Sequence, residues 1–130
     1  MKISDIMTPC PYKVSGEKSL TEALKMMELR GISHLPVANG EEIVGVLSKR
    51  DLEVANFVCE TTNFCPSVMD ICRDEPYSVN IDTPVAQVTE DMGSKKTDYA
   101  LVIDHQGNIV GIFTVTDACR LVTLLLNETE

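Results

Sequence analysis

GVLSKRD at residues 45–51 returns as GIFTVTD at residues 111–117. Both stretches follow one pattern: a Gly, two apolar residues, a hydroxyl side chain and, three residues later, an Asp. The pattern is typical of a strand that runs directly into a helix. Ser and Thr are favoured N-cap residues, and a carboxylate in the first turn suits the helix dipole. The sequence therefore predicts two strand–helix junctions, with helices starting near Lys49 and Val115.

The similarity between the two stretches extends outward over most of the chain. Matching residues share an offset of 65: Asp5 with Asp70, Tyr12 with Tyr77, Val14 with Val79, Met27 with Met92, and Val37 with Val102. One residue is inserted in the second copy within 104–107, and beyond it the offset is 66. Loops tolerate such insertions. The chain is thus a tandem repeat, which we divide into residues 1–62 and 63–130.

Each copy predicts an extended segment, a helix, a β-hairpin and a second helix. In the first copy Ser19 and Glu22 form a capping box and Gly31 ends the helix, whereas in the second copy Thr83 is the expected N-cap, followed by Pro84. The order β-α-β-β-α, twice, indicates an α/β fold. A copy of about 65 residues is marginally stable alone. We therefore expect the two repeats to pack sheet to sheet with pseudo-twofold symmetry, leaving clefts between them.

Composition excludes several classes of protein. The net charge of −9 disfavours binding to nucleic acid or anionic lipid. The opening residues lack the apolar run of a secretory signal, so we expect a cytoplasmic protein. Five cysteines without a signal peptide predict reduced, mostly buried thiols. A metal site on Cys59, Cys65 and Cys72 is the alternative, but their spacings match no zinc pattern.

The two junctions also offer chemistry for a nucleotide. A glycine in a strand lets another group approach closely. The hydroxyl and the free N–H groups of a helix start suit a phosphate, and the carboxylate suits a ribose diol. Simple helix capping by Ser48 and Thr114 is the alternative explanation, although it leaves the preceding glycines unexplained.

The whole chain resembles the cystathionine-β-synthase (CBS) domain family. The resemblance rests on both junctions, on DIMT at residues 5–8, on LTEAL at residues 20–24 and on ISHLPV at residues 32–37. It implies a stand-alone pair of CBS repeats, called a Bateman module, whose clefts hold AMP, ATP, NAD or S-adenosylmethionine, with or without Mg²⁺. It also implies that two modules pair into a disc-like dimer. The residues themselves predict no catalytic residue and no metal site.

The resemblance also implies roles for individual residues. Asp51 and Asp117 would contact ribose, and Ser48 and Thr114 would contact ribose or phosphate, with Thr116 beside the second site. Adenine would lie against the extended segment and hairpin of each copy: Val14, Ile32, His34 and Leu35 in the first, and Val79, Tyr99 and Ala100 in the second.

The two sites differ in local charge. Lys49 and Arg50 lie within the first motif, where the second copy has Val115 and Thr116. The positive end of a helix disfavours cations, so Lys49 and Arg50 need a partner. We therefore expect the first site to bind phosphorylated adenosine more tightly. The alternative is that Lys95 and Lys96, just before the second hairpin, supply the phosphate contact.

These observations favour a regulatory sensor of an adenosine ligand that acts on a partner in trans. The second hypothesis is a constitutive adaptor that binds no nucleotide. An enzyme is disfavoured, because no catalytic pairing, P-loop or Rossmann fingerprint occurs. A homodimer through the helices is expected from the apolar residues near the C-terminus: Leu121, Val122, Leu124, Leu125 and Leu126.

Overall fold

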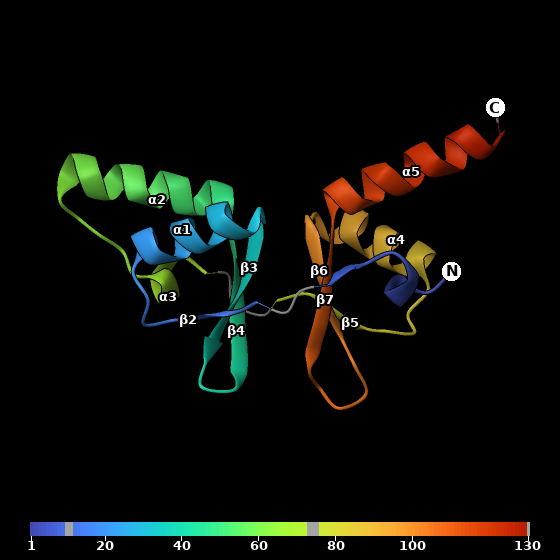
Figure 1. Ribbon diagram of the computed structural model, residues 1–130, viewed down its shortest axis with the longest axis horizontal. Helices are drawn as coiled ribbons and strands as arrows, with labels where there is room; N and C mark the ends of the chain where they lie inside the picture. The colour runs from blue at the N-terminus through green and yellow to red at the C-terminus, as the bar shows by residue number, and fades with distance from the viewer. Residues whose placement is uncertain (10–11, 73–75, 130) are drawn as a thin grey trace. The chain divides into compact units, whose positions relative to one another are not determined.

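The computed structural model describes residues 1–9, 12–72 and 76–129. The chain forms two compact units. Tyr12–Pro76 is called here the first-repeat unit, and Met1–Pro11 with Tyr77–Glu130 the second-repeat unit. Each unit contains a mixed sheet and the β-α-β-β-α series predicted from the sequence (Figure 1). The α/β fold class and the tandem repeat are confirmed.

The first-repeat unit contains β2 (Val14–Ser15), α1 (Leu20–Arg30), β3 (His34–Asn39), β4 (Glu42–Ser48), α2 (Lys49–Thr62) and α3 (Val68–Ile71). Its strands are ordered β2-β3-β4, with β2 parallel and β4 antiparallel to β3. The side chain of Ser19 accepts a hydrogen bond from the Glu22 N–H at 3.1 Å. Gly31 ends α1 in the left-handed conformation, φ 66°. The N-cap and the C-terminal glycine of α1 are therefore confirmed.

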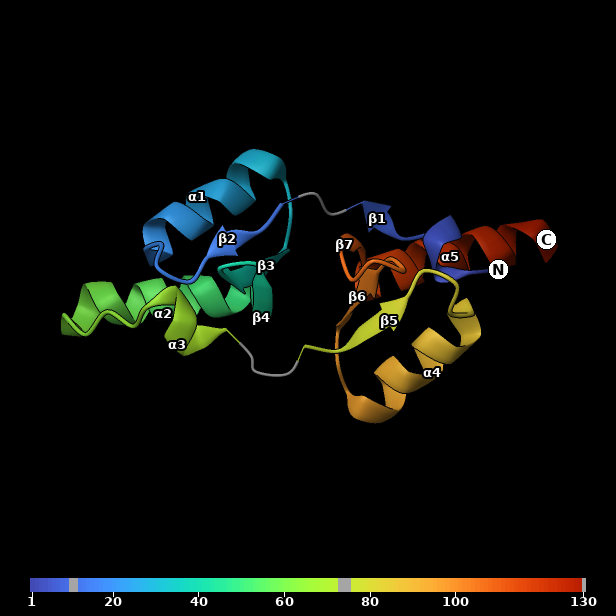
Figure 2. The same ribbon diagram turned by 90° about the horizontal axis from the view of Figure 1, so that it is seen from below.

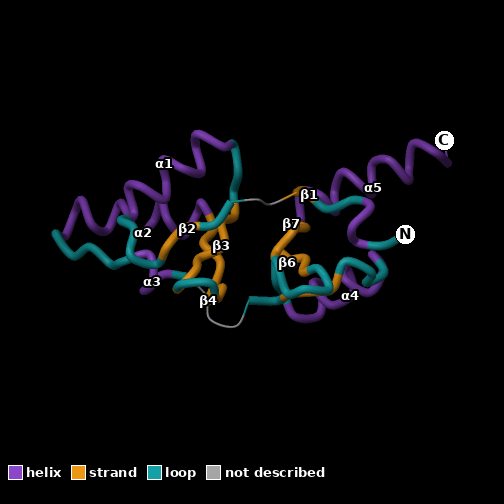
Figure 3. Tube along the Cα trace, turned by 60° about the horizontal axis from the view of Figure 1, so that its bottom comes forward, coloured by secondary structure: helices purple, strands orange, loops and turns teal. Residues whose placement is uncertain are grey.

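The core of this unit lies between the sheet and its helices, which gather on one side of the strands (Figure 3). Met27 of α1 and Leu52 of α2 meet Leu35 and Leu47 of the hairpin there, all fully buried. Met27 and Leu52 therefore anchor the two helices to the sheet.

The second-repeat unit contains the 3₁₀ helix η1 (Ile3–Asp5), β1 (Thr8–Pro9), β5 (Ser78–Asn80), α4 (Val85–Lys95), β6 (Tyr99–Ile103), β7 (Ile109–Thr114) and α5 (Val115–Thr129). Its strands are ordered β1-β7-β6-β5. Strand β5 runs parallel to β6, whereas β7 is antiparallel to both β6 and β1. Phe113 is its largest fully buried side chain.

The N-terminal segment completes this unit, although it belongs to the first copy in sequence (Figure 2). Ile3 is fully buried in the core with Val88 and Phe113. The Val85 N–H donates to the Met1 carbonyl at 3.1 Å, and the Ile3 N–H donates to the Thr83 carbonyl at 2.8 Å. The expected N-cap is consequently wrong: α4 begins at Val85 after Pro84, and no side chain caps it.

The exchange is reciprocal. Val68, the repeat equivalent of Ile3, is fully buried in the core of the first-repeat unit. Ile3, near the start of the first copy, thus packs in the core of the second-repeat unit, and Val68, near the start of the second copy, packs in the core of the first-repeat unit. The compact units differ in this way from the division at residues 62 and 63 expected from the repeat.

Gly111 provides the close approach expected of the motif glycine, but to the chain's own N-terminal segment. It pairs with Pro9 of β1, and a Cβ at Gly111 would stand 3.1 Å from the Thr8 carbonyl oxygen and collide with the Met7 side chain. The interpretation of this glycine as an opening for a ligand is therefore corrected.

We expect Gly111→Ala to lower the free energy of unfolding by about 1–3 kcal/mol, the usual range for overpacking. Gly93→Ala is the matched control, because nothing lies within 4 Å of a Cβ at this position. A helical Gly→Ala change stabilises by about 0.5–1 kcal/mol. Urea unfolding of both variants measures the difference, and equal stability of the two would refute the close-approach explanation.

The cysteines differ from the expectation of reduced, mostly buried thiols. Cys59 and Cys65 form a disulfide, and Cys119 is an exposed free thiol, whereas Cys72 is buried. The expectation is wrong for the first three, and Cys10 lies outside the described residues.

In the part of the chain that the structure describes, no helix combines the length and apolar character needed to cross a membrane.

Candidate functional site

The first junction places its predicted residues at one end of the first-repeat hairpin. His34 pairs with Ser48 across β3 and β4, and α2 begins at the next residue. The Ser48 hydroxyl accepts a hydrogen bond from the Asp51 N–H at 3.0 Å, and the Lys49 N–H donates to the Ser33 carbonyl at 2.8 Å. Ser48 is therefore an N-cap, and this cap presents Asp51 in the first turn.

The charged side chains of this junction have few partners within the protein. Among residues 1–9, 12–72 and 76–129, no hydrogen bond or ion pair is formed by the side chains of Lys49, Arg50 or Asp51. Asp51 and Lys49 are half-buried and Arg50 is exposed. Two cations and a carboxylate thus stand around the start of α2 and are available to an external group.

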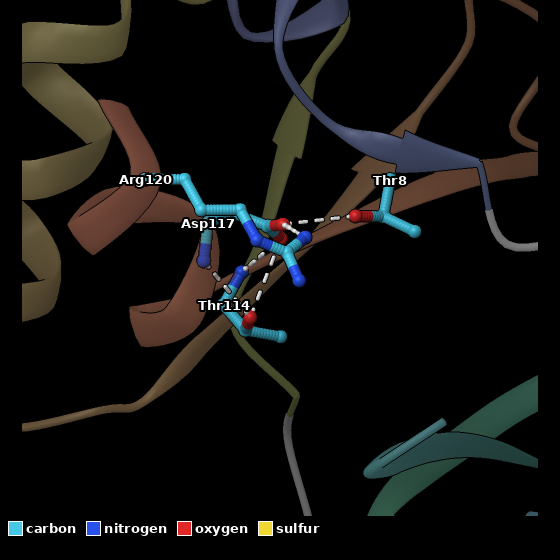
Figure 4. A network of polar contacts seen from close by, with 4 residues as sticks. All are labelled: Thr8, Thr114, Asp117 and Arg120. Carbon is cyan, nitrogen blue, oxygen red and sulfur yellow. Dashed lines mark hydrogen bonds and ion pairs between the residues drawn. The ribbon is translucent and has the colours of Figure 1, made fainter. Parts of the chain in front are cut away.

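The second junction has the same backbone geometry as the first, but here other residues of the protein bind the carboxylate of Asp117 (Figure 4). The Thr114 N–H donates to Asp117 Oδ2 at 2.9 Å, and the Thr8 hydroxyl donates to Oδ1 at 2.9 Å. The Arg120 guanidinium lies 3.7 Å from Oδ1. Asp117 is 9% exposed and is the one charged residue buried in the described part of the chain.

Sequence reasoning missed Thr8 and Arg120 in this network. Thr8 lies 109 residues before Asp117 and reaches it only because β1 pairs with β7. Arg120 could have been found from its spacing, since residues three apart on a helix are neighbours. Its repeat equivalent is Val54, so only the second junction carries a cation at this position.

The residues expected to contact adenine are largely buried. Val14, Leu35, Tyr99 and Ala100 are at most 5% exposed, and Val14, Leu35 and Ala100 lie in the two cores. Ile32, His34 and Val79 are half-buried, and Thr116 is exposed. Val14 pairs with Val37, three residues along β3 from His34, or about 10 Å at the usual rise of a strand. The junction therefore does not bring Val14 to the hairpin end.

A second pair of equivalent contacts flanks the extended segments. The guanidinium of Arg30 lies 4.5 Å from the centre of the Tyr12 ring, and the ammonium of Lys95 lies 4.6 Å from that of Tyr77. Burial, with a hydrogen bond from the Tyr77 hydroxyl to Asp91 at 3.0 Å, raises the pKa of Tyr77 to about 12. Lys95 thus already has a partner, which weakens the alternative that it contacts phosphate.

We expect substitution of Asp117 to lower the free energy of unfolding more than substitution of Asp51. Asp117→Ala removes the acceptor of two part-buried hydrogen bonds, from the Thr114 N–H and the Thr8 hydroxyl, and a lost hydrogen bond to a charged group costs about 1.5–3 kcal/mol. Asp51→Ala removes only a favourable charge at a helix start, about 0.3–1 kcal/mol. Chemical denaturation of both variants compares the losses. A loss for Asp51→Ala as large as that for Asp117→Ala would contradict this reading of the networks.

Within the described ranges, no group of three or more His, Cys, Asp or Glu side chains is arranged to hold a metal ion. What the first junction offers instead is a hydroxyl, backbone N–H groups, two cations and a carboxylate. These groups can bind a phosphate and a diol together, which is the chemistry of a nucleotide.

Comparison with known proteins identifies relatives of the entire fold. The profile of the CBS domain family matches residues 3–55 and 68–123. The inosine-5'-monophosphate dehydrogenase of Korarchaeum cryptofilum is 30% identical over 115 residues, which make up 88% of this chain and 22% of that enzyme. The A-adding tRNA nucleotidyltransferase of Aquifex aeolicus is 28% identical over 124 residues, or 94% of this chain and 14% of that enzyme. The chain thus spans about a fifth of the length of the dehydrogenase and 14% of the length of the nucleotidyltransferase.

Solved structures share the fold over nearly their full length. The CBS domain pair of protein MJ0100, in complex with 5'-methylthioadenosine and S-adenosyl-L-methionine, has a TM-score of 0.81 and 24% identity, covering 95% of this chain and 96% of that chain. CBSX2 in complex with AMP has a TM-score of 0.75 and 24% identity, covering 95% and 97%.

Proposed function

Because this chain belongs to the CBS domain family, as a tandem pair of CBS repeats, we propose that it is a regulatory sensor of an adenosine ligand. The observation that carries the proposal is the first junction, where Ser48, Asp51 and two cations gather at the start of α2. Two structural relatives, CBSX2 and the MJ0100 pair, were solved with AMP and with S-adenosyl-L-methionine. The ligand class proposed is therefore AMP, ATP, NAD or S-adenosylmethionine.

In the first-repeat unit, Asp51 accepts hydrogen bonds from the ribose diol, and Lys49 and Arg50 face the phosphate. The absence of internal partners for these three side chains in the described residues supports this assignment. Ile32 and His34 border the adenine, whereas the buried Leu35 contributes backbone groups only, and Val14 lies too far along the sheet to take part.

In the second-repeat unit, the ligand competes with the protein for the same carboxylate. Thr8, Thr114 and Arg120 already contact both oxygens of Asp117, so a ribose diol meets a carboxylate that is partly engaged. This competition, together with Val115 and Thr116 in place of two cations, makes the second site the weaker one.

We propose that the sensor acts on a protein partner in trans and forms a homodimer. Val122, Leu124, Leu125 and Leu126 on α5 are each about half exposed or more, as are Val54 and Phe57 on α2, so apolar helix surface remains to be covered. Light scattering at micromolar concentration tests the dimer, and a monomer mass would reject it. A constitutive adaptor without ligand remains the second candidate; free polar groups at the first junction favour the sensor.

A thermal-shift panel tests the sensor directly. AMP, ATP, NAD and S-adenosylmethionine, each with and without Mg²⁺, are added to the purified chain, with guanosine monophosphate as the control. Ligand at 100 times its Kd stabilises by about 2.7 kcal/mol, which raises the melting temperature by several degrees. No shift with any of the four ligands would favour the adaptor.

Arg50→Ala is expected to weaken AMP and ATP much more than adenosine. A contact between a cation and a phosphate contributes about 1.5–3 kcal/mol, which is about 10-fold to 150-fold in affinity. Thr116→Ala, at the equivalent position of the second repeat, is the matched control and should leave the tighter phase unchanged. Equal losses for the nucleotide and the nucleoside would show that Arg50 does not contact phosphate.

A further inference from the structure

The end of α2 carries a disulfide that the sensor function does not use. The helix stops at Thr62, and Asn63 takes the left-handed conformation, φ 61°, with its N–H donating to the Cys59 carbonyl at 3.1 Å. This turn brings Cys65 back beside the last turns of α2, where the two cysteine Cα atoms lie 4.4 Å apart. The repeat equivalent of Cys59 in α5 is Leu125, so the bridge belongs to one repeat only.

The bridge lies outside the hydrophobic core. The buried residues of α2 are Leu52 and Ala55, and no residue from Asn56 to Ser67 is buried. Cys65 is exposed, and the adjacent Phe64 is 67% exposed. An attacking thiolate can therefore reach Cys65 without unfolding of the unit.

The remaining hydrogen bonds of this segment are local. The hydroxyls of Thr61 and Thr62 donate to carbonyls one turn back, and the Phe64 N–H donates to the Thr62 hydroxyl. Helix ends without buried contacts open readily. The covalent bridge therefore restrains a helix end that contributes no residue to the hydrophobic core.

We propose that Cys59–Cys65 is a reversible thiol–disulfide exchange site, which a dithiol reductant opens to release the end of α2. The reductant's thiolate attacks Cys65 Sγ, the bond between the two cysteine sulfurs breaks, and the electron pair leaves on Cys59 Sγ, which takes up a proton. The second thiol of the reductant then attacks its own sulfur in the mixed disulfide and releases Cys65. The reductant ends as a disulfide, and this chain ends with two thiols.

Two physical arguments favour exchange over a structural staple. The bridge joins two cysteines with a sequence separation of 6, and the stabilisation from a disulfide decreases as its loop shortens. Exposed disulfides are also the ones that exchange with thiols, whereas structural ones resist reduction. A bridge of this kind constrains a local segment and contributes little to the global fold.

The test compares reduction of the native chain with reduction of the same chain unfolded in urea. Dithiothreitol is added to each, samples are alkylated, and the thiols are counted by mass with peptide mapping. We expect Cys59 and Cys65 to gain labels together, at a native rate within tenfold of the unfolded rate, and to close again in oxidised dithiothreitol. A native rate lower by a thousandfold or more, or no bridge in chain purified without reductant, would overturn the proposal.

Amide hydrogen exchange measures the structural consequence. Peptides covering residues 57–66 are expected to exchange at least tenfold faster after reduction, and those covering 99–114 at an unchanged rate. Cys59→Ser should show the fast rate in both redox conditions. Cys119→Ser, at an exposed free thiol on α5, is the matched control and should keep the redox difference. Equal exchange of residues 57–66 in the oxidised and reduced chain would overturn the release of α2.

Discussion

The Ile3→Ala variant is expected to loosen the second-repeat unit, not the repeat to which Ile3 belongs in sequence. Ile3 is fully buried beside Val88 and Phe113, and truncating a buried Ile to Ala costs about 2–5 kcal/mol. Native-state hydrogen exchange should therefore accelerate over residues 77–129 and stay nearly constant over residues 12–72.

Val68→Ala gives the crossed control. Val68 is fully buried in the other core, so its truncation should accelerate exchange over residues 12–72 at a cost of about 1–3 kcal/mol. Met1→Ala should change neither unit, because Met1 is 69% exposed. If Ile3→Ala loosened the first-repeat unit instead, the reciprocal exchange of opening segments would be wrong.

Asp51→Ala is expected to remove the tighter phase of adenosine-ligand binding. Hydrogen bonds to a charged group contribute about 1.5–3 kcal/mol each, so losing both ribose contacts lowers affinity by about 100-fold or more. The fold should survive, because Ser48 still caps α2 through the N–H of residue 51. Calorimetric titration with AMP measures the loss.

Asp117→Ala is the matched variant for the second site and should remove only the weaker phase. Its interpretation requires a stability control, because Asp117 also holds Thr8 and Thr114 in place. If Asp117→Ala abolished tight binding while Asp51→Ala left it intact, the assignment would be reversed and Lys96 would become the candidate phosphate contact.

Local patterns in the sequence predicted the elements well. Ser19, Gly31 and Ser48 act where their types and spacing indicate, because capping depends on residues within one turn. The repeat also predicted equivalent junctions, since one residue pattern yields one local backbone geometry in both copies.

Contacts between distant segments were not predictable in this way. Thr83 has a suitable side chain, yet the Met1 carbonyl accepts the Val85 N–H in its place. The same N-terminal segment fills the space beside Gly111 and covers Asp117. The disulfide was missed because Cys65 approaches Cys59 only through the left-handed turn at Asn63.

Locating a bound ligand on the protein tests the adenosine site at the start of α2 without relying on any substitution. Backbone amide chemical shifts are recorded while AMP is added to the isotope-labelled chain. We predict the largest changes at residues 32–34 and 48–51, and smaller changes at 114–117 and at Thr8. In the Asp51→Ala variant, the changes at residues 32–34 and 48–51 should disappear. Changes confined to other surfaces, or no changes with AMP, ATP, NAD or S-adenosylmethionine at millimolar concentration, would contradict an adenosine site at the start of α2.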